Sequence, residues 1–205
     1  MKNLIAALLV LLLLTGCTGM RLVGSDVQAV STVAAGMAPP AGSLTGGRYR
    51  FERLPLHATH PQSERIEAIA QAALTKVGLM RDDASAQFSA LLGARIESYV
   101  ADLWGQSVGP WVHGGWPVHG HTMGGHGGIL PGFGLRLPPP TFYRYEVGLV
   151  LRDLRSSQVV FETRAMHEGP WSDADNILPA LFEAALKDFP NAPTGVRRIN
   201  IEIPR

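Results

Sequence analysis

Four histidines share the stretch of chain between Gly105 and Pro140. They are His113, His119, His121 and His126. Neutral imidazole is a ligand for Cu, Ni and Zn, and only one residue separates the second of these histidines from the third, which brings two rings close together. The stretch contains no thiolate and no carboxylate, and its many glycines make an ordered site entropically costly. Two interpretations stay open: a specific site for Cu, Ni or Zn, and a glycine-rich spacer that binds metal only weakly.

Two tryptophans lie in the same stretch, which the run Pro138-Pro139-Pro140 closes. Compact domains seldom keep so long a loop without a use. The apolar body of a tryptophan is costly to leave in water, so both side chains are candidate contacts for a protein partner. These candidate contact residues are Trp111 and Trp116.

The other residues that could carry chemistry do not form a catalytic set. The sequence contains no phosphate-binding loop, no dinucleotide fingerprint and no paired catalytic carboxylates. Aspartates fall in predicted turns, where they are expected to cap backbone N–H groups; they are Asp82, Asp83, Asp173 and Asp175. Three further histidines, His57, His60 and His167, are interpreted as capping or surface residues. We therefore expect a protein that is not an enzyme and that carries no cofactor.

Residues 1–17 have the pattern of a bacterial lipoprotein signal. A positive start containing Lys2 precedes an aliphatic run from Leu4 to Leu14, and Thr15-Gly16 supplies the small residues that a signal peptidase needs. The run is too short to span a membrane, which takes about 20 apolar residues. The stretch Leu14-Thr15-Gly16-Cys17 resembles a lipobox, in which Cys17 is acylated and becomes the mature N-terminus. Each methylene of such a lipid contributes about 0.8 kcal/mol when it enters a bilayer, so several acyl chains anchor a protein durably.

Charge and cysteine content narrow the possible partners. The chain has 18 basic and 17 acidic residues, so loss of Lys2 with the leader leaves 17 of each. A neutral chain is not expected to bind nucleic acid, which is held through concentrated positive charge. A single cysteine excludes an intramolecular disulfide. By resemblance to Gram-negative lipoproteins, Thr18 after the cysteine favours export to the outer membrane, where the lipid would be the membrane contact.

Hydrophobic periodicity predicts five strands and two helices in the order β-α-β-β-β-α-β. Alternating apolar residues indicate strands at 49–54, 87–104, 141–154, 159–165 and 197–203. Apolar residues at three- and four-residue steps indicate one helix that starts near Thr59 or Pro61 and ends at Gly78. They indicate a second helix that Asn176 caps and Pro190 ends, with Pro179 in its first turn.

Each predicted strand has one apolar face and each helix one apolar stripe. We therefore expect an α+β two-layer sandwich, in which both helices cover one face of a largely antiparallel sheet of about five strands. The long loop at 105–140 is inserted between the second and third strands. The other face of the sheet is expected to be solvated and to carry cross-strand charge pairs. Its predicted residues are Arg95, Glu97, Arg144, Glu146, Arg152, Glu162, Arg164 and Glu202.

The domain organisation follows from composition. Residues 1–16 are the expected signal peptide, and residues 17–47, which are poor in charge and rich in glycine and proline, are the expected lipidated N-terminus and flexible tether. Alternation near Asp26 to Val33 leaves open a short added strand within the tether. Residues 48–205 form a single α+β domain.

Several stretches together resemble the bacterial lipoproteins of domain of unknown function (DUF) family 4136. They are the leader, the strand Tyr49 to Leu54, the helix exit Gly78-Leu79, the hairpin 145–162 and the closing Leu186-Lys187-Asp188-Phe189-Pro190. The likeness covers roughly Tyr49 to Pro190. The chain departs from the family pattern at Phe161, where tryptophan is common, and at Gln87, where aspartate is common. The resemblance implies a lipoprotein with an α/β fold and implies no chemistry.

The sequence therefore predicts a non-enzymatic lipoprotein on the periplasmic face of the outer membrane, anchored through Cys17. Its domain is expected to bind or scaffold an envelope protein. The alternative is a periplasmic protein that binds a transition metal through the histidines of the loop, and a purely structural spacer is a third class. The sequence indicates no oligomeric state.

Overall fold

The computed structural model describes residues 19–32, 44–55, 61–100 and 140–204, together with the backbone of residues 128–129 and 136–137. Its two helices are α4 (Ser63–Lys76) and α5 (Ala174–Leu186). The strands of its main sheet are β1 (Met20–Ser31), β2 (Arg48–Glu52), β3 (Met80–Arg81), β4 (Phe88–Val100), β7 (Thr141–Asp153), β8 (Val159–Gly169) and β9 (Val196–Pro204). Two short strands, β5 (Gly128–Ile129) and β6 (Arg136–Leu137), pair only with each other. Within these ranges, no helix is both long and apolar enough to cross a membrane.

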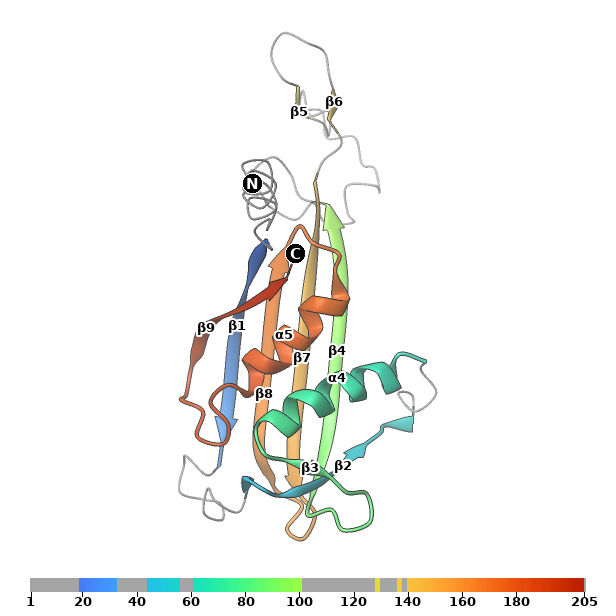
Figure 1. The fold of residues 1–205 in the computed structure, drawn as a ribbon, viewed down its shortest axis with the longest axis vertical. Coiled ribbons are helices and arrows are strands. Elements are labelled where there is room, and N and C mark those ends of the chain that lie inside the picture. Colours follow the sequence, from blue (N-terminus) through green and yellow to red (C-terminus); the bar gives the residue numbers. More distant parts are fainter. Residues whose placement is uncertain are drawn as a thin grey trace, which may run out of the picture.

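The main sheet has seven strands in the order β3-β2-β4-β7-β8-β1-β9. β2 runs parallel to β3 and to β4, and the other neighbouring strands are antiparallel, so the sheet is mixed. The predicted α+β class is confirmed. The expectation of about five strands is wrong, because β1 and the short β3 also belong to the sheet. Figure 1 shows α4 and α5 on the same side of it.

Strand β1 overturns the expectation that residues 20–31 belong to a flexible tether. It lies between β8 and β9 and pairs with both. Val23, Val27 and Ala29 point into the core and are almost completely buried. The alternation that indicates this strand begins before Asp26, and the glycine- and proline-rich composition typical of a tether begins only after Ser31. Hydrogen bonds to the two neighbouring strands satisfy the backbone N–H and C=O groups of β1. Local composition does not reveal these neighbours.

Three long strands form the centre of the sheet. β4 pairs with β7 over its whole length, from Phe88 opposite Asp153 to Val100 opposite Thr141. β7 and β8 form the predicted hairpin, whose turn is closed by the Asp153 carboxylate. That carboxylate accepts hydrogen bonds from the backbone N–H groups of Arg155 (2.7 Å) and Ser156 (3.2 Å).

The face of the sheet away from the helices carries cross-strand charge pairs, as expected, although Glu168 is not among the residues predicted for it. Arg144 on β7 contacts Glu168 on β8 at 3.0 Å, and Arg164 on β8 contacts Glu146 on β7 at 2.6 Å. All four side chains are partly exposed, so each pair contributes little to stability. Because these side chains are charged and partly exposed, this face of the sheet is in contact with water.

Helix α5 packs the most buried apolar residues of either helix against the sheet. Most of its predicted stripe is buried, namely Ile177, Leu178, Leu181, Phe182, Ala185 and Leu186, whereas Phe189 is half-buried and lies beyond the last residue of the helix, Leu186. The Thr163 hydroxyl on β8 donates to the Ala185 carbonyl at 2.9 Å, which fixes the helix against the sheet. The N-cap is Asp173, whose carboxylate accepts from the Asn176 N–H, so the prediction that Asn176 is the cap is wrong by three residues.

Helix α4 ends where the sequence predicts. Gly78 has φ +89°, a conformation that only glycine adopts without strain, and Leu79 N–H donates to the Leu74 carbonyl at 3.0 Å. Ala70, Ala73 and Leu74 face the core, whereas Ile66 near the N-terminal end is only half-buried. The first half of α4 therefore covers the sheet less completely than the second.

Candidate functional site: a groove beside an open sheet edge

One edge of the sheet is incomplete. β2 pairs with β4 only from Phe88 to Leu91, whereas β7 pairs with β4 as far as Val100. Among the residues that the structure describes, Leu92–Val100 thus has a strand neighbour on the β7 side alone, as Figure 1 shows for the upper half of β4. In an antiparallel pair, alternate residues direct their backbone N–H and C=O groups away from the partner. These groups make an exposed edge that accepts another strand.

The helix-facing side of the same segment is apolar and exposed. Phe88 and Ala90, which lie under α4, are 3% and 0% exposed, whereas Ile96 and Val100 are 46% and 41% exposed. The strand keeps its alternation, but the layer that should cover its second half is absent from the described part of the chain. Covering Ile96 would contribute about 1 kcal/mol.

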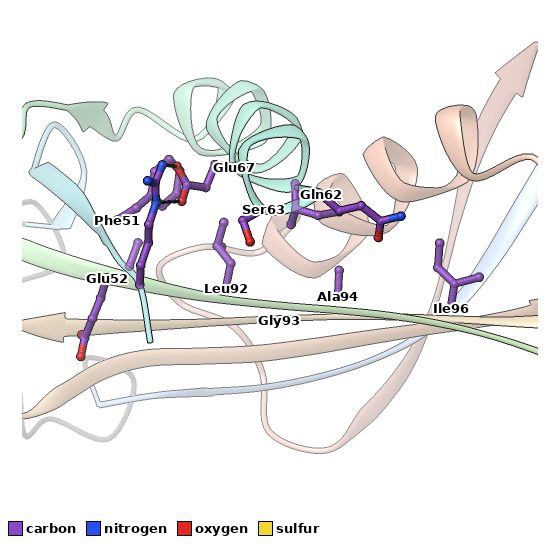
Figure 2. Close-up of a pocket in the computed structure, with 12 residues that line it drawn as sticks. Phe51, Glu52, Gln62, Ser63, Glu67, Leu92, Gly93, Ala94 and Ile96 are labelled. Carbon is purple, nitrogen blue, oxygen red and sulfur yellow. Dashed lines mark hydrogen bonds and ion pairs between the residues drawn. The ribbon is translucent and has the colours of Figure 1, made fainter. Parts of the chain in front are cut away.

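A groove of about 480 Å³ follows this edge, and we call it the β4 groove. Figure 2 shows Leu92, Ala94 and Ile96 rising from β4 into it. Ser63 of α4 and Gln62, the residue before that helix, face them. Its lining residues are Phe51, Glu52, Arg53, Gln62, Ser63, Ile66, Glu67, Ala90, Leu92, Gly93, Ala94 and Ile96. The groove begins where β2 ends and lies between α4 and the helix-facing side chains of β4, beside the edge that a longer β2 would cover.

An ion pair closes the β2 end of the groove. Arg53 donates from Nε to Glu67 Oε1 at 2.5 Å and from Nη2 to Glu67 Oε2 at 2.8 Å. Glu67 is buried on α4, whereas the side chain of Arg53 is 42% exposed. On the neighbouring strands, the Ser89 hydroxyl donates to Glu52 at 2.8 Å. Both groove carboxylates are thus held by hydrogen bonds, an arrangement that fixes structure rather than one that moves a proton.

The opposite edge of the sheet differs in character. β9 alternates buried Ile199 and Ile203 with Arg198, Asn200 and Glu202, and it ends at Pro204. Charged side chains and proline are the usual devices that prevent an edge from pairing with another strand. The open part of β4 has only Arg95 and Glu97 for this purpose, and its apolar residues are uncovered. Of the two edges, β4 is therefore the better docking surface.

A second polar cluster lies at the N-terminal end of α5. Arg21 forms an ion pair with Asp173 and its guanidinium lies 5.4 Å from the centre of the Trp171 ring. His167 is buried within β8, and its Nδ1 lies 2.8 Å from the Gly24 carbonyl oxygen. The interpretation of His167 as a capping or surface residue is therefore wrong. No cluster of three or more metal-binding side chains occurs among the described residues.

The site residues indicated by the sequence lie outside the described part of the chain, and their roles stay predictions. They are Cys17, Trp111, Trp116, His113, His119, His121 and His126. The stretch Gly105-Gln106-Ser107-Val108-Gly109 also lies there, and its Gly-x-Ser-x-Gly spacing is that of a serine nucleophile elbow. The open edge of β4 gives no such motif. Its sequence signal is the continued alternation of Leu92, Ala94 and Ile96 beyond the reach of the short β2.

Comparisons with known proteins give only distant likenesses. No family model and no curated protein match the chain. It resembles a PDZ domain protein from Parabacteroides distasonis with 12% identity and a TM-score of 0.49, over 90% of this chain and 39% of that one. It also resembles two structures of the PelC dodecamer from Paraburkholderia phytofirmans, one of them of a variant with a single substitution. Both have 12% identity, with TM-scores of 0.42 and 0.43, over 79% of this chain and 94% of that one. Likeness at this level assigns neither a family nor a function.

Proposed function

We propose that this protein is a non-enzymatic lipoprotein whose domain binds or scaffolds an envelope protein. In this proposal a lipid on Cys17 holds it to the periplasmic face of the outer membrane, and the domain is a two-layer sandwich of DUF family 4136. The lipobox pattern supports the anchor. The observation that carries the binding function is the open edge of β4 from Leu92 to Val100, with the apolar β4 groove beside it.

The chemistry of this edge defines the kind of contact. An added strand would satisfy the free backbone groups of β4, and its alternate side chains would enter the β4 groove beside Ala94 and Ile96. Main-chain hydrogen bonds supply affinity in this mode, and the side-chain pockets supply specificity. Trp111 and Trp116 are a second proposed contact region for the same partner.

Photocrosslinking in intact cells tests the binding function. A photoreactive amino acid replaces Ile96 on the open edge or, as the matched control, the exposed Glu202 on the protected β9 edge. We expect an adduct with an envelope protein from the first position and little from the second. Equal yields from the two positions, or no adduct from Ile96, would contradict a partner site at β4.

Two further measurements test the remaining parts of the proposal. Cys17→Ala should leave an uncleaved precursor or move the protein out of the outer-membrane fraction, and a processed, membrane-bound variant would contradict the anchor. A fluorophosphonate probe should not label Ser107, because a non-enzymatic protein has no activated serine. Labelling that Ser107→Ala abolishes would instead make the protein a serine hydrolase.

A further inference from the structure

The open edge of β4 is complementary to itself. An antiparallel pair centred on Ile96 places Arg95 of one copy opposite Glu97 of the other, twice by symmetry. The same alignment places Gly93 opposite Tyr99 on the solvated face, and Leu92 opposite Val100 and Ala94 opposite Ser98 on the helix side. Opposite charges that face each other directly across strands are stabilising, and like charges are destabilising.

The charges select this alignment over its neighbours. A shift of one residue would place helix-facing side chains opposite solvated ones, which the pleat forbids. Sliding the pair by two residues in one direction places Arg95 opposite Arg95, and in the other direction it places Glu97 opposite Glu97. Only the alignment centred on Ile96 pairs unlike charges and keeps every apolar side chain on the helix side.

Symmetry also requires the antiparallel arrangement. A two-fold axis perpendicular to the sheet keeps the helices of both copies on one side and makes the two edge strands antiparallel. The axis passes between Ile96, which is 46% exposed, and Ile96 of the second copy. The apolar strip beside the β4 groove, uncovered in one copy, is then covered by the same strip of the other.

We propose that β4 pairs with β4 of a second copy of this chain, centred on Ile96, to form one continuous sheet. This inference rests on the proposed function, because it names the occupant of the same edge. It also fixes the geometry of anchoring. β1 begins at the end of the sheet where β4 finishes (Figure 1). β7 and β8 separate β1 from β4, so the two N-terminal ends lie on opposite sides of the two-fold axis. Both lipids therefore reach one membrane only when the sheet lies parallel to it.

Charge reversal in the full-length protein, purified in detergent, tests the pairing. Arg95→Glu places two acidic pairs at the interface, and Glu97→Arg places two basic pairs there. We expect each variant alone to dimerise at least about tenfold more weakly than the unchanged protein in analytical ultracentrifugation. An equimolar mixture of the two should recover the dimer, because unlike charges then face each other. Arg198→Glu on β9 is the matched control and should leave dimerisation unchanged.

Disulfide trapping tests the register. Ile96→Cys should give a covalent dimer on mild oxidation, whereas Asn200→Cys on β9 should give no more dimer than the unchanged chain, whose only cysteine is Cys17.

Recovery of the dimer in the mixture of Arg95→Glu and Glu97→Arg also shows that both charge variants are folded. The inference is overturned if the unchanged protein is monomeric. It is also overturned if each charge variant alone dimerises as well as the mixture does. If the protein is monomeric but Ile96 crosslinks to another envelope protein in cells, the proposed function stands and the second copy does not. If neither the dimer nor a crosslink from Ile96 forms, both the proposed function and this inference fail.

Discussion

Glu67 of α4 accepts both hydrogen bonds that the Arg53 guanidinium donates, at 2.5 and 2.8 Å, although only Arg53 is well exposed to water. The pair joins the chain just after β2 to the first half of α4, at the β2 end of the β4 groove. The hydrogen bonds with Glu67 raise the pKa of Arg53, so the guanidinium stays charged. Removing one member of a buried ion pair destabilises the folded state, because the other charge is left without a partner. Removing both members is tolerated better.

Arg53→Ala should therefore lower the midpoint of urea unfolding, because Glu67 is left buried without its partner. Arg50→Ala, on the exposed side of β2, is the matched control and should change the midpoint little. Adding Glu67→Gln to Arg53→Ala should recover part of the loss. Additive effects of the two substitutions would mean that the ion pair contributes nothing.

Strand β1 is expected to be essential to the domain. Val27→Asp places an unpaired charge at a position that is 0% exposed, and it should lower the free energy of unfolding by about 3 kcal/mol or more. Gln28→Asp, at the next residue on the solvated face, should change it by less than about 0.5 kcal/mol. Similar stabilities for the two variants would show that residues 20–31 are a tether after all.

Asp173 should make stability depend on acid pH. The hydrogen bonds that Asn176 donates, followed by the charge of Arg21, hold the pKa of Asp173 below its usual range. A lowered pKa stabilises the folded state above the unfolded value of about 3.9, and this contribution is lost as pH falls through the folded pKa. Asp173→Ala should cost about 1 kcal/mol at pH 7, as loss of an N-cap usually does.

Asp173→Asn separates the cap from its charge. It keeps an N-cap acceptor, so most of the stability at pH 7 should remain, but unfolding should depend less on pH below about pH 4 than in the unchanged protein. Urea unfolding between pH 2 and pH 7 measures both effects. Parallel pH profiles for the two proteins would assign the acid dependence to other carboxyl groups, such as Glu168, whose pKa is lowered by the Tyr99 hydroxyl and by Arg144.

Tyr49 is expected to limit stability at alkaline pH. It is 0% exposed, its hydroxyl has no hydrogen-bond partner among the described residues, and burial raises its pKa to about 12. Its contribution is complete below pH 10 and is lost as pH rises toward about 12, by about 1.4 kcal/mol per pH unit. Tyr49→Phe should remove that loss and leave stability at pH 7 equal or slightly higher. A marked loss at pH 7 would reveal a partner for the hydroxyl.

The histidines of the loop give a prediction that separates the two interpretations of that segment. If the protein only binds a partner, elemental analysis should find negligible metal both in the untagged protein and in a variant in which His113, His119, His121 and His126 are alanine. Stoichiometric metal that the variant loses would make the loop a specific site.

Local sequence patterns determined the elements of this domain. The apolar stripe from Ile177 to Leu186 predicts α5, alternation predicts β7 and β8, and the positive φ of Gly78 ends α4 as expected. These features follow from neighbouring residues along the chain, because helices and strands repeat every 3.6 and 2 residues.

Only the tertiary structure decided how these elements meet. Alternation in β1 and β4 shows that one face is apolar, but it cannot say which strand lies alongside or which helix covers that face. Among the described residues, the short parallel β2 leaves Leu92–Val100 without a second strand neighbour, and the fold brings Arg53 to Glu67 and buries His167 beside Gly24. These contacts join residues that are distant in sequence or belong to different elements, so packing rather than local periodicity creates the candidate site.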